Sequence, residues 1–175
     1  MTSMETEFQR IRGHIISQAA GLTPAELAEK VRVGTAQLHA IAAAVPVAHF
    51  AQRPGPNDWS AAEVYTHILA MNEHGAQAIE GILDAGVQPP PISDVVTGEA
   101  RADLADAEAY WQVYIARREA LLARVVRAAG DERLEIKIVH NWFGPLNWRE
   151  WLLFMRFHDL DHMRQLQAIA AHFSA

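Results

Sequence analysis

Two histidines stand four residues apart in the segment FHDLDHMRQL, which covers residues 157–166. His158 and His162 are set among apolar neighbours in this segment. Residues at positions i and i+4 of a helix lie on one face, so both imidazole rings could point toward one spot. Neutral imidazole is the commonest metal ligand in proteins, and this spacing suits two ring nitrogens on one ion. The alternative interpretation is a pair of core-edge histidines that hydrogen-bond to the backbone or to water.

The surrounding pattern excludes two familiar metal sites. The segment is not His-Glu-x-x-His, so the general base of the zinc proteases is missing. The chain contains no Glu-x-x-His pair, which disfavours a ferritin-like di-iron site. It also contains no cysteine, which excludes disulfides, cysteine–zinc sites and cysteine nucleophiles.

A third histidine, His67, lies in the segment EVYTHILAMNEH. It follows Val64 by three positions and precedes Ile68 by one, and both of these belong to an apolar stripe of helical spacing. His67 is therefore expected on the flank of the buried face, where it could point inward. His74 lies seven positions later, so we expect it on the same face and lining the same cavity. The other histidines are predicted to be exposed or half-buried: His14, His39, His49, His140 and His172.

Glu63 has two interpretations. It lies four residues before His67, so it could orient that imidazole or act as a base near a metal. It also lies three residues after Ser60, the spacing of a capping box, and we favour this structural role. Trp59 and Trp151 are predicted to be core residues.

Three polar residues near His158 and His162 could support the site. Gln165 follows His162 by three positions, so it faces the same cavity and could bind water or substrate, or satisfy a backbone group. Asp161 lies close to the histidine face and could support a ligand from behind. Asp159 is expected to point well away from that face, in a solvated or salt-bridged position.

The elements that must position these residues are predicted to be helices. Apolar residues at intervals of three and four predict one short N-terminal helix and four long ones, at about residues 8–19, 24–45, 60–84, 99–129 and 147–173. Thr23, Ser60 and Asn147 are each followed three residues later by glutamate, the signature of a helix start. Three consecutive prolines at residues 89–91 exclude a regular helix there. The alternation in RLEIKIVH predicts extended chain or a small strand.

These elements predict an all-α fold, a four-helix bundle with a short extra N-terminal helix. The 175 residues fit one domain over residues 1–175, with 50% hydrophobic and 21% charged residues. No internal repeat or linker divides the chain. The long connections leave room for a non-simple helix order.

The charge argues against nucleic acid as a partner. The chain has a formal net charge of −6 and a pI of about 5.8, whereas phosphate binding needs a basic stripe. No run of 18 apolar residues predicts a membrane span, and the N-terminus lacks the pattern of a signal peptide. We therefore expect a cytoplasmic protein.

Two segments together resemble the DinB-like metalloprotein superfamily. NDWSAAEVYTHILAMNEH contains the Trp-Ser-x-x-Glu-x-x-x-His pattern that opens the second helix of that family, and GPLNWREWLLFMRFHDLDHMRQLQAI contains its His-x-x-x-His followed by glutamine. The resemblance extends over about residues 24–173. It implies a four-helix bundle of unusual helix order that holds a divalent metal, often zinc or nickel. The matching ligand positions are His67, His158 and His162.

Three histidines leave an open coordination position, which is typical of catalytic sites. Several relatives are thiol-dependent transferases or isomerases that use bacillithiol, mycothiol or a similar thiol. The resemblance thus implies a metal-dependent thiol S-transferase acting on small molecules, with a low-molecular-weight thiol as cosubstrate. A non-catalytic, stress-related metal-binding protein and a metal-dependent hydrolase remain alternatives.

The last predicted helix is apolar on more than one side. Phe154, Phe157 and Leu160 lie away from the histidine stripe, so either the rest of the chain or a second subunit must cover them. The family often forms dimers, and we expect a homodimer.

Overall fold

The computed structural model of the chain describes residues 3–92 and 99–174. In chain order its elements are α1 (Ser3–Gly21), α2 (Pro24–Thr35), α3 (Leu38–Ala43), the short 3₁₀ helix η1 (Val47–His49), α4 (Ala61–Ala85), α5 (Ala107–Val126), β1 (Ile138–His140), β2 (Gly144–Leu146) and α6 (Trp148–Ser174). The predicted all-α class is confirmed. Across the described ranges, no helix has the length and apolar character needed to cross a membrane.

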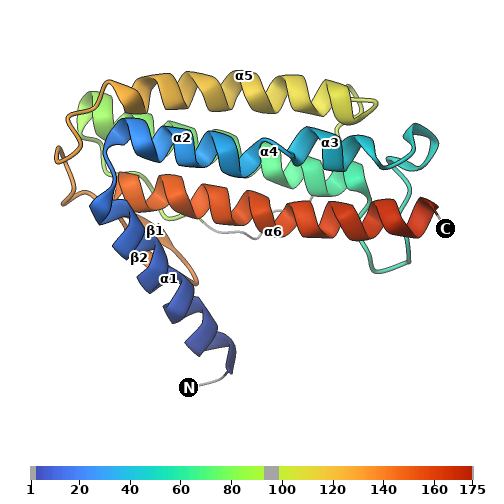
Figure 1. Cartoon of the computed structure of the whole chain (residues 1–175), viewed down its shortest axis with the longest axis horizontal. Helices are drawn as coiled ribbons and strands as arrows, with labels where there is room; N and C mark the ends of the chain where they lie inside the picture. Colours follow the sequence, from blue (N-terminus) through green and yellow to red (C-terminus); the bar gives the residue numbers. More distant parts are fainter. Residues whose placement is uncertain (1–2, 93–98, 175) are drawn as a thin grey trace.

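The long helices pack lengthwise against one another. α4 packs against α5 and α6, and α2 and α3 pack against the same two helices. In Figure 1, α2, α3 and α6 run in one direction, whereas α4 and α5 run in the other. Because α4 and α5 are parallel neighbours, Ala85 at the end of α4 and Ala107 at the start of α5 lie at opposite ends of these helices. The residues between them in the sequence are the long connection for which the sequence left room.

Reciprocal caps fix where three helices begin, as the sequence predicted. Thr23 begins α2 and Ser60 begins α4, each in a capping box with the glutamate three residues later. At the start of α6, Asn147 Oδ1 accepts the backbone N–H of Glu150 at 3.0 Å, while the Glu150 carboxylate accepts the N–H of Asn147 at 2.8 Å. These bonds satisfy backbone donors that would otherwise lack partners at each helix start.

The predicted helix over residues 24–45 is interrupted. α2 ends at Thr35 and α3 begins at Leu38. The Thr35 hydroxyl donates to the Val31 carbonyl at 3.0 Å, a bond by which a side chain perturbs a helical turn. Gly34, a poor helix former, lies against Arg156, and a Cβ at this position would be 2.2 Å from Arg156 Nε. The Arg156 side chain of α6 thus occupies the space beside Gly34 near the point where the helix ends.

The helix predicted from residue 99 begins later. α5 starts at Ala107, where the Asp106 side chain accepts the N–H of Ala109 at 2.9 Å. Its buried face includes Leu122 and Val125. Tyr114 and Arg118 are fully buried, whereas Trp111 is only half-buried.

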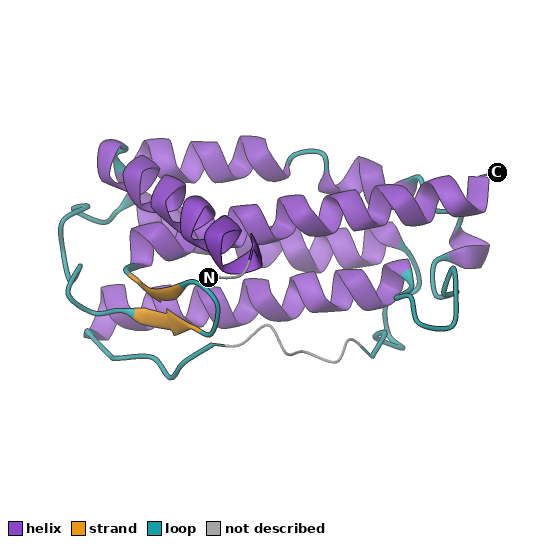
Figure 2. Cartoon of the chain, turned by 90° about the horizontal axis from the view of Figure 1, so that it is seen from below, coloured by secondary structure: helices purple, strands orange, loops and turns teal. Residues whose placement is uncertain are grey.

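Parts of the same chain cover the extra apolar side of α6. α1 packs on α6 at an angle to the other helices, and the β1–β2 hairpin lies nearby (Figure 2). The Phe154 ring lies 5.0 Å from that of Phe143 in the hairpin, and the Phe157 ring lies 5.8 Å from that of His14 in α1. This side of α6 therefore needs no second subunit, and the homodimer stays a prediction.

The interior contains two apolar clusters with a polar layer between them. The first joins α1 and α2 to the C-terminal halves of α4 and α5 and the first turns of α6. The second joins α3 to the N-terminal halves of α4 and α5 and the C-terminal half of α6. Halfway along, Asn72, Arg118 and Asp159 are buried on α4, α5 and α6. The histidines lie beside this layer.

Candidate metal centre

Packing of α4 against α6 brings His67, His158 and His162 together. Each offers one nitrogen, and these three atoms lie within 4.8 Å of one another. The Nε2 atoms of His67 and His158 are 2.8 Å apart. Among the described residues, no other group of three His, Cys, Asp or Glu side chains converges in this way.

One pair of these nitrogens has nearly the spacing expected on a shared ion. Histidine nitrogens bind zinc at ~2.0–2.1 Å, so two of them on one ion lie ~2.9–3.4 Å apart at angles near 90–109°. The 2.8 Å between His67 Nε2 and His158 Nε2 is close to that range. The group could therefore hold a metal ion, with neutral nitrogen donors only.

The surroundings of His162 favour the neutral ring that metal binding requires. Burial, and then the neighbouring His158, lower the pKa of His162. Its Nδ1 lies 3.0 Å from Gln165 Oε1, which can only accept a hydrogen bond. The proton therefore resides on Nδ1, which leaves the Nε2 lone pair available. Gln165 lines the same cavity as His162, as predicted, but its observed contact with a histidine is none of the roles considered from the sequence.

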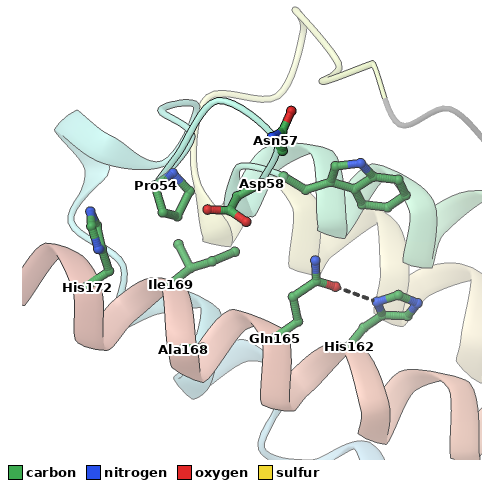
Figure 3. Close-up of a pocket in the computed structure, with 9 residues that line it drawn as sticks. Pro54, Asn57, Asp58, His162, Gln165, Ala168, Ile169 and His172 are labelled. Atoms are coloured by element: carbon green, nitrogen blue, oxygen red, sulfur yellow. Dashed lines mark hydrogen bonds between the residues drawn. The ribbon is translucent and has the colours of Figure 1, made fainter.

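A groove opens beside His162. It encloses about 550 Å³ between the loop that precedes α4 and the C-terminal half of α6 (Figure 3). Its lining consists of Pro54, Asn57, Asp58, Trp59, His162, Gln165, Ala168, Ile169 and His172. His67 and His158 are buried, so the groove reaches the histidine group from the His162 side. A small molecule could approach the three nitrogens by this route.

Trp59 belongs to the site, although it was predicted to be a core residue. It is half-buried, lines the groove, and places its ring edge-on to His67 with 5.5 Å between centroids. The available signal was its position directly before the cap residue Ser60, where an apolar side chain packs back on the first turns of the helix. Trp151, in contrast, is fully buried, as predicted.

Glu63 has the structural role that we favoured. Its carboxylate accepts the Ser60 N–H at 2.7 Å and Arg53 Nε–H at 2.9 Å. The Arg53 guanidinium is the main reason that the pKa of Glu63 lies below its ordinary value, and burial opposes the shift. Because Arg53 belongs to the loop that walls the groove, Glu63 fixes this loop to the start of α4.

A buried ion pair lies behind His158. Asp159 Oδ2 accepts hydrogen bonds from Arg118 Nη2 at 2.8 Å and from the Tyr114 hydroxyl at 2.7 Å. Arg118 Nε donates to Asn72 Oδ1 at 2.8 Å. Burial alone would raise the pKa of Asp159, but Arg118, His158 and Tyr114 hold that pKa below its ordinary value. The side chain stays ionised within the interior.

Asp159 thus corrects the sequence interpretation. It was expected to point well away from the histidine face, yet its Oδ1 lies 3.5 Å from His158 Nδ1. The salt-bridged role is correct, whereas a solvated one is not, since only 1% of the side chain is exposed. The sequence analysis missed its partner Arg118. The available signal was helical spacing, since Ile115 follows Trp111 by four positions and Arg118 follows Ile115 by three.

Two other predicted site residues lie at the surface. Asp161 is exposed, and its carboxylate lies 3.8 Å from Arg164. His74 is exposed on α4 and does not line the groove. Seven residues fall ~20° short of two full helical turns, so His74 is rotated by that angle around the helix axis relative to His67. Because His67 already lies on the flank of the buried face, this rotation turns His74 toward the outside. The prediction that these side chains face the cavity is not met.

Comparison with known proteins adds one finding. The family model of the DinB superfamily matches residues 31–166, which include all three histidines. Neither the comparison with curated proteins nor that with solved structures gives a match.

Proposed function

The chain belongs to the DinB superfamily, and from this premise we propose that it is a metalloprotein in which His67, His158 and His162 hold a divalent ion, zinc or nickel. We also propose that its long helices form the four-helix bundle of that family. The observation that supports this proposal is the convergence of the three imidazoles beside an open groove. A closed structural site would instead have four protein ligands and no route to the outside.

The proposed reaction is the transfer of a low-molecular-weight thiol, of the bacillithiol or mycothiol type, to a small electrophile. A divalent ion held by the neutral imidazoles of His67, His158 and His162 would supply a positive charge that favours the nucleophilic thiolate form of a thiol near neutral pH. The thiolate sulfur bonds to the electrophilic carbon, and the leaving group departs with its bonding electron pair. The chain has no cysteine, so the sulfur has to come from the cosubstrate.

Residues around the histidines support this reaction by position. Gln165 keeps the His162 proton on Nδ1, which leaves the lone pair of Nε2 free for a metal ion. Trp59 covers the edge of His67 and reduces access of water. Glu63 and Arg53 fix the loop that forms the opposite wall. Holding two reactants in one groove lowers the barrier by proximity.

Two alternatives use the same ligands. A metal-dependent hydrolase would use the open coordination position to activate water. A non-catalytic metal-binding protein would use this position neither to bind a thiol nor to activate water. The groove favours an enzyme over the non-catalytic alternative, because a binding module needs no route for a substrate.

The first prediction concerns metal ligation. Replacing His67, His158 or His162 by Ala should weaken zinc or nickel binding by more than the ~10- to 100-fold typical of losing an outer partner of a ligand. Elemental analysis of the purified variants, followed by competition with a chelator, measures the effect. His74→Ala is the matched control, because this histidine lies on α4 but is exposed.

His74→Ala should retain wild-type metal content. Full metal occupancy in the His158→Ala/His162→Ala variant would contradict the proposed site.

A further inference from the structure

The groove beside the histidines carries one fixed charge. Asp58 is the only acidic residue in its lining, which contains no lysine or arginine. Arg53, in the same loop, is bound to Glu63. His172 is the other titratable group in the lining besides His162. Asp58 is therefore the one permanently charged side chain of the groove wall.

Local geometry turns the Asp58 carboxylate toward α6. The Asp58 N–H donates to the Gly55 carbonyl at 3.2 Å, which folds the loop back on itself. Asp58 Oδ2 lies only 2.7 Å from the position of a Cβ on Gly55, so glycine leaves the space that this side chain uses. In Figure 3 the carboxylate points into the hollow above Ile169, while the Asn57 side chain points away. Asp58 is exposed beside the groove, and none of the ion pairs between described residues includes it.

The groove presents its chemical groups in a fixed order along α6. His162 lies at the inner end, Gln165 follows one turn later, and Ile169 lies below Asp58. With a rise of ~1.5 Å per residue, the span from His162 to Ile169 is ~10 Å. A ligand of a few bonds could bind the site at one end and approach Asp58 with the other.

We propose that the groove selects aminothiols: small molecules with a thiol at one end and a protonated amine at the other. This inference rests on the proposed metal site, where the sulfur binds as a thiolate. The ammonium group is attracted to Asp58, whose unpartnered carboxylate would otherwise face the groove alone. A carboxylate at the same position of the ligand is repelled instead. Both effects operate within the screening length of ~8–10 Å in ordinary buffers.

The test compares three thiols of equal chain length on the cobalt-loaded full-length protein at pH 8. These are 3-aminopropane-1-thiol, 3-mercaptopropan-1-ol and 3-mercaptopropanoate, which differ only in the charge of the end group. Sulfur coordination adds a charge-transfer band in the near ultraviolet, and titration of that band gives each dissociation constant. The variant is Asp58→Asn, which removes the charge but keeps the size. Asp161→Asn is the matched control, because Asp161 is exposed and outside the groove.

Asp58→Asn should weaken binding of the aminothiol by about 2- to 5-fold and tighten binding of the carboxylate thiol by a similar factor, as for partly exposed charge pairs. The neutral thiol should bind equally to both proteins. Comparing each thiol between the two proteins cancels the different acidities of the thiols themselves. In the wild type, raising the salt concentration should reduce the preference. Asp161→Asn should behave like the wild type.

The outcomes separate this inference from the proposed function. Sulfur bands could appear with all three thiols while the order of their affinities is the same in wild type and in Asp58→Asn. This result would overturn the selection of aminothiols and leave the metal site intact. Absence of a sulfur band with every thiol would overturn the thiol reaction and this selection with it. Circular dichroism of Asp58→Asn has to match the wild type, since Asp58 also lies near the start of α4.

Discussion

Gln165 determines which nitrogen of His162 carries the proton. Its Oε1 accepts the Nδ1 proton, so the lone pair is on Nε2. A histidine without such a partner exchanges its proton between the two nitrogens and turns more freely. Partners of this kind fix both the tautomer and the orientation of a metal ligand.

Changing Gln165 should therefore alter metal affinity without removing a ligand. Gln165→Leu should weaken zinc binding by about 10- to 100-fold, because Nδ1 loses its acceptor. Gln165→Glu should retain tight binding, since a carboxylate accepts the same proton. Chelator competition on the two variants measures the difference. Equal affinities for wild type and Gln165→Leu would show that the tautomer is fixed in another way.

The sequence placed the three histidines correctly on the faces of two helices but misplaced their neighbours. Helical spacing gives the direction of Cα–Cβ bonds, and this suffices for His158 and His162. It does not give the path of a side chain beyond Cβ. Asp159 reaches Arg118 and Tyr114 on α5 because that helix lies against its face, whereas Asp161 has no such neighbour among the described residues.

At the scale of the elements, a buried polar layer joins α4, α5 and α6. Asn72, Arg118 and Asp159 occupy positions where each helix would otherwise present an apolar residue to the core. An ion pair in such surroundings adds little net stability, because the cost of removing both charges from water offsets their attraction. Losing one partner is costly, because the other charge then remains buried alone.

Asp159→Ala should destabilise the metal-free protein by about 3–5 kcal/mol. The double variant Arg118→Met/Asp159→Leu should be destabilised less than Asp159→Ala, because neither charge remains. Urea unfolding in the presence of a chelator separates this effect from metal binding. Asp161→Ala is the control and should change the stability by no more than about 0.5 kcal/mol. If the double variant is the least stable of the three variants, the ion pair makes a net contribution to the free energy of unfolding, which contradicts the prediction.

The starts of helices were the most predictable feature at this scale. Thr23, Ser60 and Asn147 carry the chemistry of a cap in themselves and in the residue three positions on. The break after Thr35 was not predicted, because the apolar spacing continues through it from α2 into α3. The burial of Tyr110 and Arg118 on α5 was missed because it depends on contacts with other helices. Tyr110 contacts Thr66 on α4, and Arg118 donates hydrogen bonds to Asn72 on α4 and Asp159 on α6.

At the scale of the whole molecule, the three histidines link helices that are distant in the sequence. His67 lies on α4 and the other two on α6, so one bound ion would connect residues 91 positions apart in sequence. The connection from Ala85 to Ala107 adds a long return between α4 and α5. A ligand that binds only the folded chain stabilises the whole arrangement by mass action.

Metal loading should therefore raise the unfolding temperature of the entire domain. A free metal concentration 1,000-fold above the dissociation constant contributes about 4 kcal/mol. For a chain of this length, each kcal/mol shifts the midpoint by roughly 2–4 °C, so the expected increase is about 8–16 °C. Calorimetry of chelator-treated and zinc- or nickel-loaded protein measures the shift. His158→Ala/His162→Ala should show none, whereas His74→Ala should show the full shift. A wild type that elemental analysis finds fully loaded, but whose midpoint does not change, would place the ion outside the α4–α6 interface.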